Sequence, residues 1–257
     1  MRAELISIGD ELLSGRTLNT HGRDLGLHLF NIGIALERDT TVGDQPDQIG
    51  AAVDEALKRV PILFISGGLG PTTDDITLET LSTYFDRPII EDQNTVEHLN
   101  DWYQKRGRVL NSHGQKQAWV LENALVLQNP VGAAPAQQLT LSPQQLCFLL
   151  PGPPKEFNAI LTRSILPKLS SLYPEARPKE VRTLHTRGIG ESDLIANMEQ
   201  GQFHLSPQIT AGFYPGEGQV EIRLSAHPED KALLDQTLYE LQQLFNEFLA
   251  LVDAPDD

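Results

Sequence analysis

A glycine-rich stretch that ends in two acids is the part of this chain best equipped for chemistry. The ten residues Ser66–Asp75 read SGGLGPTTDD, follow the apolar run Ile62–Ile65 and precede a helical pattern. A glycine-rich turn between a strand and a helix exposes backbone N–H groups, and the helix dipole favours an anion there. The stretch matches neither the P-loop nor the dinucleotide fingerprint. An ordinary tight turn, with Thr73 or Asp74 capping the helix, explains three glycines equally well.

Carboxylates at the ends of three predicted strands indicate a metal ion. Asp10 and Glu11 follow the first strand, Asp44 follows the second, and Asp75 follows the third. Each acid alone is also explained as a helix cap or as a partner of the helix dipole. Because parallel strands end at the same edge of a sheet, we expect the four acids to converge. Beside a phosphate-binding turn they would repel the phosphate unless a cation such as Mg²⁺ lay between them.

A second candidate group follows two consecutive prolines. Lys155 and Glu156 would lie in the first turn of a helix. The helix dipole favours the glutamate but not the lysine, so a phosphate partner would explain the lysine. Among the seven histidines there is no His-x-x-x-His pair, and His113 near the middle loop is the one to examine.

Composition excludes several classes of protein. The net charge is −15, from 20 basic and 35 acidic residues, which argues against binding to nucleic acid. No apolar run approaches the ~20 residues of a membrane span, and the first residues lack the layout of a signal peptide. Cys147 lies in an apolar run and is predicted to be a small buried hydrophobic residue. We expect a cytoplasmic protein that has no membrane contact.

The order of the predicted elements indicates an α/β fold. The first 85 residues alternate between strands and helices, which is typical of a parallel sheet with crossover helices. We expect a helix from Asp92, a helical piece near 115–121, a strand near 124–127, a hairpin within 139–150 and a further helix. A proline-bearing linker at 173–178 precedes a smaller α+β unit. The predicted domains are 1–172 and 178–252, followed by a disordered acidic tail at 253–257.

Several motifs in this order resemble those of the CinA family. They are Gly9–Leu12, Ser14-Gly15, Asn19-Thr20, Thr40–Asp44, Ser66–Asp75, Asn129–Pro135, Leu150–Glu156 and Gly188–Ser192. The resemblance is to the amino-terminal region of CinA, whose core is similar to the molybdopterin-binding domain of MoaB, MogA and gephyrin. It implies a three-layer αβα core with a mostly parallel sheet, a small α+β domain and a homodimer. Full-length CinA proteins usually carry a carboxyl-terminal nicotinamide-mononucleotide deamidase domain, which this sequence does not include, so deamidation is not expected.

For CinA-type members the resemblance implies metal-dependent hydrolysis of ADP-ribose to AMP and ribose 5-phosphate. The sequence lacks the Arg-Glu-x-x-Glu-Glu box of Nudix hydrolases, so a different site would carry this chemistry. In the molybdopterin relatives the loop reads Ser-Gly-Gly-Thr-Gly with a downstream Arg-Asp, whereas here Leu69 and Asp74 replace the threonine and the arginine. This exchange favours a metal-bridged diphosphate over molybdopterin.

The residues assigned to this site fall into three groups. The expected catalytic residues are Asp44, Asp75 and Lys155, and the expected ligands of Mg²⁺ or another divalent cation are Asp10, Glu11 and Asp75. K⁺ is a further candidate ion. The expected substrate-binding residues are Ser14, Asn19, Ser66, Gly67, Gly68, Gly70, Thr72 and Glu156. Two alternatives remain open: a pterin-binding or adenylyl-transferring protein like MogA, and a non-catalytic module that binds a nucleotide.

Overall fold

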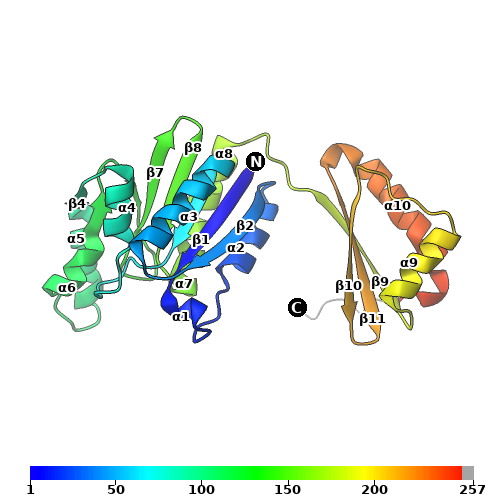
Figure 1. The fold of residues 1–257 in the computed structure, drawn as a ribbon, viewed down its shortest axis with the longest axis horizontal. Coiled ribbons are helices and arrows are strands. Elements are labelled where there is room, and N and C mark those ends of the chain that lie inside the picture. The colour runs from blue at the N-terminus through cyan, green and yellow to red at the C-terminus, as the bar shows by residue number, and fades with distance from the viewer. Residues whose placement is uncertain (251–257) are drawn as a thin grey trace. The chain divides into compact units, whose positions relative to one another are not determined.

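The chain forms two compact units, Met1–Ala176 and Arg177–Asp257 (Figure 1). The computed structural model describes residues 1–250. The predicted acidic tail at 253–257 therefore lies outside the described residues. Within the described part of the chain, none of the helices has the length and apolar character needed to cross a membrane.

A six-stranded sheet forms the centre of the first unit. Its strand order is β2-β1-β3-β8-β7-β6. The four strands β2, β1, β3 and β8 run parallel, and β7 and β6 run antiparallel to their neighbours. The strands are β1 (Arg2–Ile8), β2 (Ala35–Val42), β3 (Ile62–Ser66), β6 (Leu125–Leu127), β7 (Ala136–Ser142) and β8 (Gln145–Leu150).

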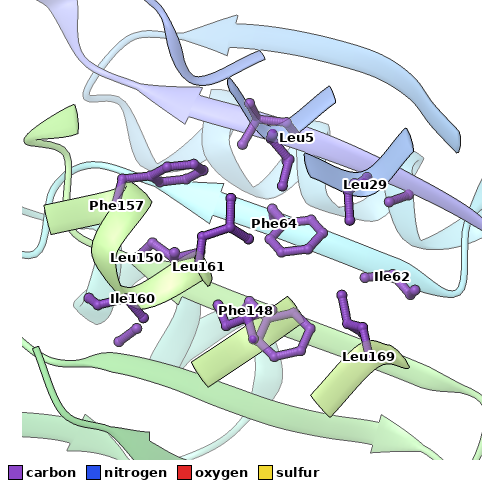
Figure 2. Close-up of a cluster of buried hydrophobic side chains, with 14 of the residues drawn as sticks. Leu5, Leu29, Ile62, Phe64, Phe148, Leu150, Phe157, Ile160, Leu161 and Leu169 are labelled. Atoms are coloured by element: carbon purple, nitrogen blue, oxygen red, sulfur yellow. The ribbon is translucent and has the colours of Figure 1, made fainter. Parts of the chain in front are cut away.

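Helices cover both faces of this sheet. Successive strand residues point to opposite faces, so Leu5 of β1 packs into one apolar cluster and Ile6 into the other. The first cluster lies under α2 (His21–Phe30), α7 (Pro154–Ile160) and α8 (Leu166–Leu172), and Figure 2 shows its aromatic centre, Phe64, Phe148 and Phe157. The second lies under α3 (Pro46–Arg59) and α4 (Thr77–Phe85). The predicted three-layer αβα architecture is confirmed.

Burial from both sides explains why the central strands are apolar along their whole length. All five residues of β3 are buried, and so are five of the six residues of β8. Cys147 of β8 is fully buried, as predicted, and this burial raises the pKa of its thiol far above the usual range.

The structure differs from the sequence prediction in three places. The helical piece expected near 115–121 consists of α6 (Ser112–Gln115), a 3₁₀ turn at Lys116–Ala118 and the strand β5 (Trp119–Leu121). The strand forms because it pairs with β4 (Ile89–Glu91), which was not predicted. The turn after β1 contains a short helix, α1 (Asp10–Leu13). Helix α4 begins at Thr77 without a side-chain cap, so neither Thr73 nor Asp74 caps it.

Two other helix starts follow the prediction. Asp92 caps α5 (Gln93–Gln104) by accepting a hydrogen bond of 2.8 Å from the N–H of Thr95. Pro46 is the first residue of α3, where a missing N–H has no cost.

The second unit is a small α+β structure, as predicted. Its antiparallel sheet has the order β10-β11-β9. Leu194, Ile222, Leu234 and Leu241 are fully buried between this sheet and two helices. The elements are β9 (Glu180–Arg187), α9 (Glu191–Gln200), β10 (Thr210–Gly216), β11 (Gln219–Ala226) and α10 (Lys231–Leu244).

Candidate functional site

The topology of the first sheet creates a crevice between β1 and β3. From β1 the chain crosses to β2 on one side and then to β3 on the other side, so the order reverses at this point. In doubly wound sheets such a reversal leaves a ligand crevice at the carboxyl ends of the strands. A cavity of about 500 Å³ lies there, lined by the segments that follow β1, β2, β3 and β8. Figure 1 shows α1 and the start of α7 at this end of the sheet.

Backbone contacts hold these segments together. The N–H of Gly9 donates to the carbonyl oxygen of Val42 at 3.0 Å, and the N–H of Gly67 donates to that of Leu150 at 3.2 Å. Gly67 has a φ of 107°, and a Cβ on it would collide with the carbonyl oxygen of Ile8. Only glycine therefore permits the close approach of the ends of β1 and β3.

Three consecutive N–H groups at the cavity have no intramolecular partner. The N–H groups of Gly68, Leu69 and Gly70 donate no hydrogen bond within residues 1–250, and all three residues line the cavity. Backbone N–H groups left free in a turn at a cavity are donors for an anion. The Ser66 hydroxyl, by contrast, is buried and donates to the carbonyl oxygen of Pro151 at 3.2 Å. The turn thus offers its backbone to a ligand.

Asp10 and Asp44 bind each other's backbone. The N–H of Asp10 donates to Asp44 Oδ2 at 2.9 Å, and the N–H of Asp44 donates to Asp10 Oδ1 at 3.2 Å. Asp44 lines the cavity, whereas Asp10 does not. Burial raises the pKa of Asp44, and the charges of Asp10, Glu11 and Asp74 raise it further, while the Asp10 N–H acts in the opposite direction.

Asp75 is held by a tight turn ahead of α4. The N–H and the hydroxyl of Thr72 both donate to Asp75 Oδ2, at 2.8 and 2.5 Å. Asp75 lines the cavity, and Thr72 does not. The contribution of Thr72 is therefore to orient this carboxylate.

Asn129 does not line the cavity itself but binds two residues that do, Ala134 and Glu156. It is 1% exposed, and its Nδ2 donates to the carbonyl oxygen of Ala134 at 2.8 Å and to Glu156 Oε2 at 2.6 Å. Its Oδ1 accepts from the N–H groups of Val131 and Gly132, at 3.1 and 2.8 Å. Burial raises the pKa of Glu156, and the hydrogen bond from Asn129 partly offsets this effect.

The structure brings most of the predicted site residues to one cavity. Nine of them line it: Glu11, Asn19, Asp44, Ser66, Gly67, Gly68, Gly70, Asp75 and Glu156. Four do not: Asp10, Ser14, Thr72 and Lys155. The Ser14 hydroxyl donates to the Glu11 carbonyl oxygen at 3.3 Å, and Lys155 is exposed on the first turn of α7.

Gln117 and His21 are among the cavity-lining residues that had no signal in the sequence. Gln117 comes from the 3₁₀ turn, and His21 from the start of α2. The His21 ring is 5% exposed and stacks on Phe157 with a centroid distance of 4.3 Å. Neither ring nitrogen has a partner at good hydrogen-bond geometry among residues 1–250. Burial lowers the pKa of the imidazole, and the nearby Gly152 backbone and the charge of Asp24 partly offset this effect. His113, the histidine singled out from the sequence, does not line the cavity.

The cavity is strongly acidic. Five carboxylates line it, from Glu11, Asp44, Asp74, Asp75 and Glu156, and no lysine or arginine of residues 1–250 is among its lining residues. Within residues 1–250, no three or more His, Cys, Asp or Glu side chains are close enough to hold a metal ion by themselves. The predicted ligands Asp10, Glu11 and Asp75 are therefore not assembled into a ready metal site.

Comparison with known proteins identifies relatives of both units. Residues 4–171 match the family described as "Probable molybdopterin binding domain", and residues 181–250 match "Damage-inducible protein CinA KH domain". A putative competence-damage inducible protein of Shouchella clausii is 35% identical over 243 residues, which are 92% of this chain and 57% of that protein. A CinA-like protein of Nostoc punctiforme is 33% identical over 98% of this chain and 60% of its own length. The chain thus spans about three fifths of the length of these relatives.

A solved structure supports the same relationship. The crystal structure of the protein CinA from Thermoplasma acidophilum, a protein described as of unknown function, is 32% identical in sequence with a TM-score of 0.57. The match covers 63% of this chain and 95% of that chain. Three kinds of evidence agree: the family matches in both units, the relatives at about 35% identity, and this solved structure. The chain therefore belongs to the CinA family.

Proposed function

We propose that the cavity between β1 and β3 binds a nucleoside diphosphate sugar and that the protein hydrolyses its diphosphate, with ADP-ribose as the candidate substrate. One observation carries this proposal: the three free N–H groups of Gly68, Leu69 and Gly70 share a cavity with several carboxylates. The N–H groups suit phosphate oxygens, and the carboxylates suit a cation and an activated water. A volume of about 500 Å³ is within the usual range for a small-molecule site.

A divalent cation fits this cavity as a companion of the ligand. Mg²⁺ commonly binds one or two carboxylates and completes its shell with waters and substrate phosphates, so it needs no cluster of three protein ligands. Glu11 and Asp75 would hold it, because their oxygens are hard donors in a site crowded with negative charge. When bound, the ion would neutralise the diphosphate and polarise its P–O bonds.

The protein's own groups then account for the remaining steps. A water oxygen attacks one phosphorus of the diphosphate, and the bond from that phosphorus to the bridging oxygen breaks. The bridging oxygen leaves with the electron pair as part of the second phosphate monoester, so ADP-ribose and water give AMP and ribose 5-phosphate. Asp44 accepts the proton of the attacking water, a role that its raised pKa favours. The N–H groups of Gly68 and Gly70 stabilise the charge on the phosphate oxygens.

The direct test is chromatographic detection of AMP and ribose 5-phosphate after incubation with ADP-ribose and Mg²⁺. Equal amounts of the two products are expected, and a chelator should stop their formation. Asp44→Asn should lower kcat by roughly 10²-fold or more, since it removes the proton acceptor. Asp101→Asn is the matched control, because Asp101 is exposed on α5 and does not line the cavity. Absence of AMP above background would refute the hydrolase.

The family match of residues 4–171 favours a second candidate, a molybdopterin-binding or adenylyl-transferring protein. This candidate predicts tight pterin binding and ATP-dependent adenylylation of the bound pterin. A thermal-shift panel of molybdopterin, ADP-ribose, AMP, NAD and ATP, each with several cations, separates the candidates. A ligand stabilises the folded protein by RT ln(1 + [L]/Kd), so a shift without turnover would indicate a non-catalytic module.

A further inference from the structure

The acidic cavity presents an electrostatic difficulty for a diphosphate. In the part of the chain that the structure describes, the lining residues include five carboxylates but neither lysine nor arginine. Lys155, the cation expected from the sequence, is exposed and does not line the cavity. A phosphate group in such a site gains strongly from a charge-assisted hydrogen bond. A lysine or arginine that donates one in addition to the divalent cation would have to border the free N–H groups from another side.

Lys116 borders these groups. A smaller hollow adjoins the main cavity and shares with it Gly68, Leu69 and Gly70, the residues of the free N–H groups. Lys116 lines this hollow and is the only lysine or arginine among the described residues that line either space. It is half-buried, and no ion pair involving it is present in residues 1–250. Its charge is therefore available to a ligand.

The side chain is guided by an aromatic neighbour. The Nζ of Lys116 lies 5.5 Å from the centroid of the Trp119 ring, and Trp119 lines the same hollow. A cation within about 6 Å of an indole face is attracted to it. This contact is weaker than a salt bridge to a phosphate, so it can keep the ammonium group at the hollow without competing with a ligand.

Hydrogen bonds hold the residues on both sides of Lys116. Gln115 Nε2 donates to Glu91 Oε2 at 2.7 Å, and the carbonyl oxygen of Ala118 accepts from the N–H of Asp92 at 2.9 Å. Ala118 is also fully buried. The 3₁₀ turn that carries Lys116 is thus anchored to β4 and to the start of α5, and it forms a defined wall of the hollow.

We propose that Lys116 binds the phosphate groups of the ligand and, together with the N–H groups of Gly68, Leu69 and Gly70, forms the phosphate subsite. This inference rests on the proposed function, because it concerns the same cavity and the same diphosphate. The sequence analysis assigned neutralisation of the phosphate charge to Lys155, and this proposal assigns it to Lys116 instead.

The test compares three substitutions at one position. Lys116→Gln removes the charge, Lys116→Met removes it while keeping the apolar stem against Trp119, and Lys116→Arg keeps it. Binding of inorganic pyrophosphate with Mg²⁺ is measured by calorimetry, and kcat and KM are measured for ADP-ribose. Lys105→Gln is the matched control, because Lys105 is exposed at the end of α5.

Lys116→Gln and Lys116→Met should bind pyrophosphate roughly tenfold or more weakly, and KM for ADP-ribose should rise similarly. The salt dependence of binding should also decrease. Lys116→Arg and Lys105→Gln should stay within about threefold of the wild type, and binding of adenosine should not change in any variant. Wild-type affinity for pyrophosphate in folded Lys116→Gln or Lys116→Met would overturn the role of Lys116 and leave the proposed function standing. A wild-type protein that binds neither pyrophosphate nor ADP-ribose would overturn both.

Discussion

Removal of the Asn129 amide should destabilise the first unit and loosen the wall of the cavity. Asn129→Ala deletes four hydrogen bonds, to Ala134, Glu156, Val131 and Gly132, from a side chain that is 1% exposed. A buried hydrogen bond contributes about 1 kcal/mol net, and a polar group left unpaired costs about 1–3 kcal/mol. Water will reach some of these groups, so the expected loss in the free energy of unfolding is about 2–4 kcal/mol.

Urea denaturation followed by tryptophan fluorescence measures this loss in the full chain. The chain has two tryptophans, Trp102 and Trp119, and both lie in the first unit. Their signal therefore reports the unfolding of the unit that contains the cavity. A shift of the midpoint at unchanged slope gives the change in the free energy of unfolding.

Asn129→Asp is the informative companion to the alanine variant. It keeps the acceptor for Val131 and Gly132 but places a second carboxylate next to Glu156, whose pKa is already raised by burial. Two carboxylates that share a site raise the pKa of one of them in the folded state. The variant should therefore be less stable than the wild type at pH 7 and should recover stability as the pH falls through the raised pKa. A loss below about 0.5 kcal/mol in Asn129→Ala, or a pH-independent deficit in Asn129→Asp, would refute this reasoning.

Two further predictions concern the same site. Gly67→Ala places a Cβ against the carbonyl oxygen of Ile8 at a φ of 107°. The variant should lose about 1–3 kcal/mol in the free energy of unfolding and should show no ligand-induced thermal stabilisation. A urea midpoint equal to that of the wild type would contradict this prediction. Burial lowers the pKa of His21, so the unfolded chain takes up a proton near pH 6.5 while the folded chain does not. The free energy of unfolding should therefore fall below about pH 6.5. His21→Phe, which preserves the stack on Phe157, should reduce this slope in urea titrations at several pH values, and an unchanged slope would exclude His21 as its source.

The layered fold could be predicted from the sequence because its signals are local. Apolar runs such as Ile62–Ile65 mark strands that are covered on both faces, and Pro46 and Asp92 mark helix starts. The position of the cavity followed in turn, because parallel strands end at one edge and their order reverses between β1 and β3. These inferences require no knowledge of long-range contacts beyond the sheet itself.

Individual site residues were harder to predict, because neighbours in sequence diverge in space. Successive residues on a helix point about 100° apart, so Glu156 lines the cavity while Lys155 is exposed. The same divergence in α1 places Glu11 at the cavity and turns Asp10 towards the Asp44 backbone. The sequence motifs named both members of each adjacent pair as site residues. In the structure only the second member of each pair, Glu11 or Glu156, lines the cavity.

The remaining residues of the site depend on tertiary packing. Lys116 lines the smaller hollow and Gln117 lines the cavity in a segment whose following strand pairs with β4, whereas the sequence favoured a helix there. Three of the hydrogen bonds of Asn129 lie within its own loop, and the fourth, to Glu156, forms only when the loop meets α7. No periodic pattern encodes such contacts.

The single thiol of the chain has a practical consequence. Cys147 is fully buried in β8, a strand that pairs with β3 on one side and β7 on the other. A thiol must ionise and meet its reagent before it can be alkylated, and burial prevents both. Labelling can therefore occur only when the sheet itself separates. The rate at which Cys147 is alkylated, measured by mass spectrometry on the unmodified protein, therefore reports how often the first unit opens.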